Sequence, residues 1–157
     1  MNEIIAELPK ELREVIYKTP ALISLYVAAR IGGGHLTSSE IKSVKQYASI
    51  LSHQGPDDVQ DYYKEVKKSI LNDIEELDQQ LPDDKNERQK EIEKRLQPVK
   101  AFISKLPVET GEVFKDTLLS FIIHARNATE DTMVSFVLPF IMDELVKLED
   151  ERLQKLL

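Results

Sequence analysis

The sequence predicts an all-α, single-domain protein, and three observations support this prediction. Apolar residues recur at intervals of three and four along most of the chain, the spacing that places them on one face of a helix. Glycine occurs only five times and tryptophan not at all, while Leu, Ile, Glu and Lys, which tolerate helices well, are abundant. The 157 residues suit one domain that buries a proper core.

Two proline-led helices are predicted in the first part of the chain. Leu8-Pro9 opens a segment whose apolar residues have amphipathic spacing, and Thr19-Pro20 opens the next, because proline is well tolerated in the first turn of a helix. The second segment is apolar nearly all round, which predicts a position at the centre of the bundle, with Leu25 buried. Gly32-Gly33-Gly34 ends it, since glycine takes the left-handed position after a helix without penalty.

The next helix begins at a capping box. In Thr37-Ser38-Ser39-Glu40, the Thr37 hydroxyl can accept a hydrogen bond from the Glu40 backbone N–H while the Glu40 carboxylate reaches back. Apolar residues follow at helical spacing to Leu51, and Gly55-Pro56 ends this helix and starts another.

Residues 57–80 predict a long helix with a narrow apolar stripe, in which Tyr62 faces the core and Tyr63 lies at its rim. Residues 57–97 hold 13 acidic and 8 basic residues, and so carry −5 of the total charge of −7. After a turn at residues 81–84, we expect a second polar helix, which completes an acidic helical hairpin over residues 57–97.

Ion pairs at helical spacing support this second polar helix. Asp84 with Arg88 and Glu91 with Arg95 are each four residues apart, a spacing that brings side chains together on a helix surface. Pro98 is expected to kink or break the helix, because proline removes a backbone donor.

The last part of the chain repeats the plan of the first. Leu106-Pro107 opens a helix that contains Phe121, which we expect to be buried, and residues 129–131 cap a final helix that Pro139 should kink. The stretch after Leu106-Pro107 matches the one after Leu8-Pro9 at an offset of 98 residues. Shared helix-start chemistry and a true duplication both explain this match. Either way, the halves are about residues 1–55 and 98–157, with the hairpin between them.

Composition narrows the possible partners and compartments. The net charge of −7 argues against nucleic acid and anionic membranes, which attract clustered Lys and Arg. The longest apolar stretch, residues 133–142, is far shorter than the ~20 residues of a spanning helix, so we expect no membrane insertion. Cysteine is absent and the N-terminus is unlike a signal peptide, which favours the cytoplasm.

Residues 21–30, the glycine turn, and His35-Leu36-Thr37-Ser38-Ser39-Glu40 resemble the TerB-like family, named for a tellurite-resistance protein and found also in some J-domain co-chaperones. The resemblance covers roughly residues 14–53, with a weaker version at 106–145. It implies a helical bundle of about seven helices built from two related halves. It also implies a role in stress response or protein association rather than catalysis.

The chain departs from the family at the turns where acidic residues have been proposed to hold a metal ion. Arg30 or Ile31 stands where the family has Asp, and Arg126 or Asn127 stands there in the second half, so only Glu40 and Glu130 match. A hard cation needs several converging carboxylates. We therefore expect no metal ligands.

Other site chemistry is sparse. The three histidines, His35, His53 and His124, lack the close spacing of a zinc site. The hydroxyls of Thr37, Ser38 and Ser39 lie at a helix N-terminus, where they either cap the helix or cradle an anion. The chain has no nucleophile motif or paired catalytic carboxylates, so we expect no enzyme and no cofactor.

Together these observations predict a non-enzymatic bacterial cytosolic protein that acts as an interaction or stress-associated module with a protein partner. A homodimer is compatible with this role. The alternative is a metal- or anion-binding sensor that uses the turn before Thr37.

Overall fold

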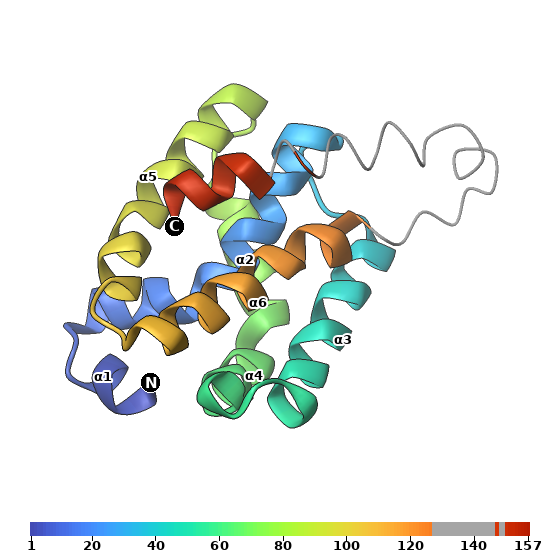
Figure 1. Cartoon of the computed structure of the whole chain (residues 1–157). Helices are drawn as coiled ribbons and strands as arrows, with labels where there is room; N and C mark the ends of the chain where they lie inside the picture. The colour runs from blue at the N-terminus through green and yellow to red at the C-terminus, as the bar shows by residue number, and fades with distance from the viewer. Residues whose placement is uncertain (127–146, 148–149) are drawn as a thin grey trace.

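Helix α2 (Lys10–Ile31) runs through the middle of the molecule (Figure 1). The computed structural model describes residues 1–126, 147 and 150–157. Every residue from Thr19 to Ala29 is buried, and α2 packs against α4, α5 and α6 as well as the short α1 (Asn2–Ala6). The predicted position of this apolar segment at the bundle centre is therefore confirmed, and Leu25 is 0% exposed.

The surrounding helices follow the predicted boundaries closely. They are α3 (Ser38–Gln54), α4 (Asp57–Gln80), α5 (Lys85–Ile103) and α6 (Val108–Arg126), and residues 150–156 are also helical. The described ranges contain no strand, which confirms the all-α, single-domain fold class. Phe121 on α6 is 0% exposed, as expected.

Pro20 does not open a new helix, contrary to the prediction, because α2 continues through it as 22 residues. Proline lacks the N–H that would donate to the carbonyl four residues earlier, which is that of Ile16. The phenol of Tyr62 on α4 donates to this buried carbonyl instead, at 2.7 Å. A tertiary hydrogen bond thus replaces the missing helical one. Pro98 likewise lies inside the continuous α5 and does not break it.

Helices α4 and α5 do not form a separate hairpin, which corrects the expected arrangement of residues 57–97. Helix α4 packs against α2 and α3, and α5 packs mainly against α2. The apolar stripe of α4 enters the core, and Tyr63, expected at the rim, is 0% exposed. Its phenol donates to the Thr117 hydroxyl at 2.8 Å. The acidic segment is therefore part of the core on one face.

Two further details differ from the prediction. Helix α1 was not expected, although Ile5 is buried. The left-handed backbone lies at Gly34 (φ 98°), while Gly32, which follows α2 directly, is extended. The expected cap at residues 129–131, the kink at Pro139 and the apolar stretch 133–142 lie outside the described residues.

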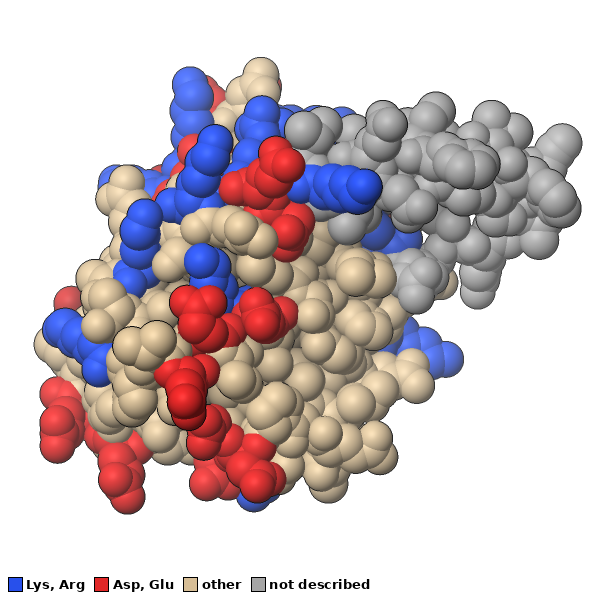
Figure 2. All heavy atoms as spheres, viewed as in Figure 1, with Lys and Arg blue, Asp and Glu red and all other residues tan. Residues whose placement is uncertain are grey.

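The two halves related by the offset of 98 residues meet in the core, because α2 packs against α6. Most of the second helix expected in the later half lies outside the described residues, so a true duplication stays a prediction. Figure 2 shows Lys and Arg gathered over α5 at the upper left, and Asp and Glu in a band over the middle of this face. None of the described helices has the length and apolar character needed to cross a membrane.

Candidate functional site

The residues predicted to cap α3 or to bind an anion lie at the N-terminus of that helix. The Thr37 hydroxyl accepts from the Glu40 backbone N–H at 3.2 Å, and the Glu40 carboxylate accepts from the Thr37 backbone N–H at 3.1 Å. The predicted capping box is therefore confirmed. Thr37 and Ser38 are exposed and Ser39 is half-buried. Anion binding by these three residues stays a prediction.

Glu40 also joins α3 to the end of α6. Its other carboxylate oxygen accepts from Nη1 of Arg126 at 3.2 Å, and both side chains are largely buried, at 5% and 15% exposed. A Cβ on Gly32 would lie 2.8 Å from the same Arg126 nitrogen, so this guanidinium packs directly over the glycine turn. Where the TerB-like pattern implies an acid, Arg126 thus supplies the positive partner of Glu40.

The three histidines lie apart. Nδ1 of His35 is 2.9 Å from Asp78, His53 contacts the Ser49 carbonyl at the end of α3, and His124 stacks on Tyr47 with ring centroids 3.8 Å apart. Burial lowers the pKa of His124. No group of three or more His, Asp or Glu side chains suited to a metal ion occurs within the described ranges.

An apolar pocket lies where α2, α3 and α4 meet, with a volume of about 350 Å³. Small-molecule sites are usually concave, mainly apolar and about 300–1,000 Å³ in volume. Leu25 and Ile74 are buried beneath it, and Leu71 at its edge is 38% exposed. The lining consists of aliphatic side chains and two carboxylates: Leu25, Leu36, Ile41, Leu71, Ile74, Glu75 and Asp78.

One of these carboxylates, Asp78, belongs to a charged cluster. Arg88 from α5, which is only 1% exposed, forms an ion pair with Asp78, and its Nη1 donates to the Asp78 backbone carbonyl at 3.2 Å. His35, from the turn before α3, contacts the same carboxylate from the solvent side. Two other segments, helix α5 and the turn before α3, therefore hold Asp78 in place.

The sequence did not reveal this cluster. It predicted a pair between Asp84 and Arg88, but Asp84 caps α5 by accepting from the backbone N–H groups of Asn86 and Glu87. The predicted pair of Glu91 and Arg95 is confirmed at 3.0 Å. The burial of Arg88 could have been predicted from its spacing. It precedes the buried Ile92 and Leu96 at intervals of four, on the apolar face of α5.

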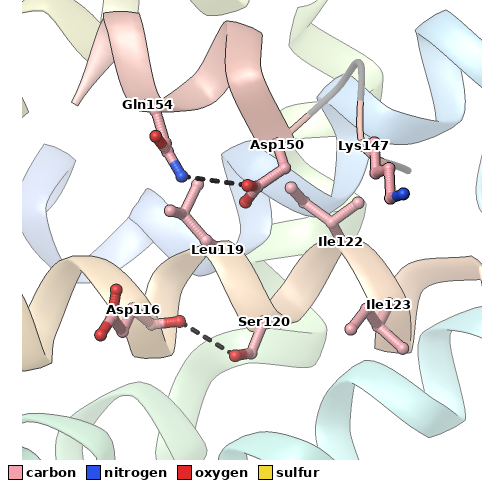
Figure 3. Close-up of a pocket in the computed structure, with 8 residues that line it drawn as sticks. All are labelled: Asp116, Leu119, Ser120, Ile122, Ile123, Lys147, Asp150 and Gln154. Carbon is pink, nitrogen blue, oxygen red and sulfur yellow. Dashed lines mark hydrogen bonds between the residues drawn. The ribbon is translucent and has the colours of Figure 1, made fainter. Parts of the chain in front are cut away.

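A second hollow of about 410 Å³ lies between α6 and the C-terminal helical stretch. Figure 3 shows Leu119 and Ile122 pointing from α6 toward that stretch, where Gln154 donates to Asp150 at 3.0 Å. Lys147 also lines the hollow, and the residues on both sides of it are not described. We therefore assign no function there.

A scan against family models and searches of curated proteins and of solved structures found no match to this chain. The candidate site is thus defined by its own geometry. The pocket between α2, α3 and α4 offers an aliphatic surface beside carboxylates. These groups suit the binding of an apolar group with a polar neighbour.

Proposed function

We propose that this protein is a non-enzymatic, cytosolic protein-interaction module, and that the pocket between α2, α3 and α4 receives aliphatic side chains of a partner protein. The observation that carries the proposal is the incomplete cover of this pocket: Leu71 remains 38% exposed above the buried Leu25 and Ile74. Covering apolar surface of this kind is the main favourable term in most protein association.

A partner helix or extended segment suits the shape of the site. The pocket lies between neighbouring helices, a common position for binding sites, and grooves of this kind receive apolar side chains of peptides at helical spacing. The stress-associated role implied by the TerB-like resemblance belongs to the same proposal. Its only support is the resemblance in sequence over roughly residues 14–53, with the weaker version at 106–145.

The test is selection of peptides from a random 12-residue display library on the immobilised full-length protein. Leu71→Asp places a charge at the pocket edge, where the exposed position tolerates it. Ile50→Asp is the matched control, because Ile50 on α3 is similarly exposed at 44% and does not line the pocket. Melting curves of both variants establish that each is folded.

We expect the selected peptides to bind the wild type and Ile50→Asp equally, and to lose at least about tenfold in affinity with Leu71→Asp, since that corresponds to ~1.4 kcal/mol of apolar contact. Peptides that bind both variants alike would place recognition elsewhere. A wild-type dimer that Leu71→Asp converts to a monomer in sedimentation would assign the pocket to a second copy of the chain and overturn the proposal.

A further inference from the structure

The two carboxylates on the pocket differ in whether their charge is already balanced. Asp78 is paired with the buried Arg88 and contacted by His35. Glu75 is exposed, and its carboxylate has no ion pair or hydrogen bond with any described residue. Glu75 therefore contributes the unbalanced negative charge of this rim.

The end of helix α4 adds to this negative potential. The last turns of a helix carry a partial negative charge from their unpaired carbonyls, which Lys or Arg normally offsets. The last turn of α4 has no basic residue. Asp78 lies in this last turn, and Arg88 from α5 donates to its backbone carbonyl. Glu75 lies less than one turn before Asp78. The Glu75 carboxylate and the helix terminus therefore favour a positive charge at the same place.

No Lys or Arg occurs among the described residues that line the pocket, although Lys residues lie close to it on both α3 and α4. On α4, Lys67 precedes Glu75 by eight residues, which corresponds to about 12 Å along a helix. On α3, Lys42 directly follows Ile41 and Lys45 lies about one turn beyond it. Among the described lining residues, the charge without an ionic partner is therefore the carboxylate of Glu75.

We propose that the pocket selects partner segments in which a Lys or Arg lies next to an aliphatic anchor, and that Glu75 is the residue that determines this preference. The inference rests on the proposed function, since it concerns the same pocket. The aliphatic side chain enters between Leu71 and Ile41, and the neighbouring cation pairs with Glu75.

Rim ion pairs of this kind contribute modestly to affinity but strongly to selectivity. An exposed pair changes affinity about two- to fivefold, and salt weakens it, because the Debye length falls from about 10 Å at 0.1 M to about 3 Å at 1 M. The expected signature is therefore a salt-dependent preference added to a salt-independent apolar contact.

The experiment repeats the 12-residue library selection on the wild type, Glu75→Lys and Glu112→Lys. Glu112 is exposed on α6 and does not line the pocket, so its variant has the same change in total charge without the local one. We expect Lys or Arg beside an aliphatic residue in peptides from the wild type and Glu112→Lys. Glu75→Lys should select Asp or Glu at that position.

Two outcomes overturn different statements. The selectivity is overturned if the selected peptides depend on Leu71 but show no preference for Lys or Arg. It is also overturned if Glu75→Lys selects the same basic peptides as the wild type. Either result leaves the proposed function standing. Peptides that do not depend on Leu71 would overturn the proposed function, and the selectivity with it. Exchanging the selected Lys for Glu should restore binding to Glu75→Lys within about two- to fivefold of the original pair.

Discussion

Tyr62 donates its phenol proton to the backbone carbonyl of Ile16, 46 positions away in the sequence. This carbonyl would have no helical donor otherwise, because the residue four positions later is Pro20. The phenol is fully buried, and burial raises its pKa well above the ordinary value, so it remains a donor at every physiological pH. The bond connects the proline site of the central helix to α4.

Tyr62→Phe should destabilise the protein by about 1–3 kcal/mol, the usual penalty for a buried polar group left without a partner. In a Pro20→Ala background the effect should be smaller, because alanine has the backbone N–H that proline lacks. Urea unfolding of the four proteins of this cycle gives the coupling energy, expected at about 0.5–3 kcal/mol. Equal effects in both backgrounds would contradict the compensation. Tyr63→Phe is the control, since Thr117 still donates to the Phe114 carbonyl.

Truncation of the core should be costly in both halves of the chain. Leu25→Ala should destabilise by about 2–5 kcal/mol and Phe121→Ala by about 3–5 kcal/mol, because both remove fully buried groups. Ile123→Ala, at a position 52% exposed on the same helix as Phe121, should stay within about 0.5 kcal/mol. Denaturant midpoints measure all three. Losses below about 1 kcal/mol at both buried positions would show that the core lies elsewhere.

Neutralising Glu40 should leave Arg126 as an uncompensated, largely buried charge. Glu40→Gln is expected to cost about 3 kcal/mol, the lower end for breaking a buried pair, because Arg126 keeps 15% of its side chain exposed. Glu40→Gln combined with Arg126→Met should be more stable than Glu40→Gln alone. If the double variant is the less stable one, the pair is not the source of the loss. Thr37→Ala, which removes only the cap, should cost about 0.5–2 kcal/mol.

Hydrogen exchange should show α4 to be as strongly protected as α2. Its buried stripe runs from Val59 to Leu77, and it packs on both α2 and α3. We therefore expect α4 to open only with a free energy close to that of global unfolding. Amides of residues 60–77 and 20–30 should therefore exchange at similar free energies. Exchange near the limit of local fraying throughout residues 60–77 would indicate that the acidic segment is peripheral after all.

Acidification should weaken the fold through His124. Burial holds the pKa of this imidazole below its ordinary value of 6.5, so the unfolded chain binds the proton more readily than the folded one. Stability from the neutral ring is therefore present above pH 6.5 and is lost as the pH falls through 6.5 toward the lower folded pKa. Urea midpoints of the wild type should fall more steeply over this range than those of His124→Gln. Parallel profiles would exclude this linkage.

Local chemistry in the sequence was sufficient to locate most helix boundaries. The box at Thr37 and Glu40, the turn at Gly55, and the apolar character of residues 19–29 each act over a few residues, so their effect can be seen in the chain itself. The continuity of α2 could not be predicted from the sequence, because a tyrosine on another helix supplies the donor that Pro20 lacks. A proline signals a break only where nothing distant supplies the missing donor.

The candidate site was less accessible to sequence reasoning for the same physical reason. Asp78, Arg88 and His35 are brought together by the packing of α2, α4 and α5, and no interval in the sequence encodes that meeting. Arg88 was assigned to the nearer Asp84, which the start of α5 uses for its own backbone. Pockets depend on gaps between helices, and spacing rules describe only the helices themselves.

The burial of α2 on all sides has a consequence for the newly made chain. Its last residue, Ile31, is synthesised 95 residues before Arg126, the end of α6 (126 − 31). At the usual ~5–20 residues per second, this interval lasts roughly 5–20 s. For much of that time helix α2, whose residues from Thr19 to Ala29 are all buried in the finished fold, lacks the neighbours that later enclose it. Early packing against α4 and α5, the neighbours of α2 that are synthesised before α6, would cover part of this surface until α6 arrives.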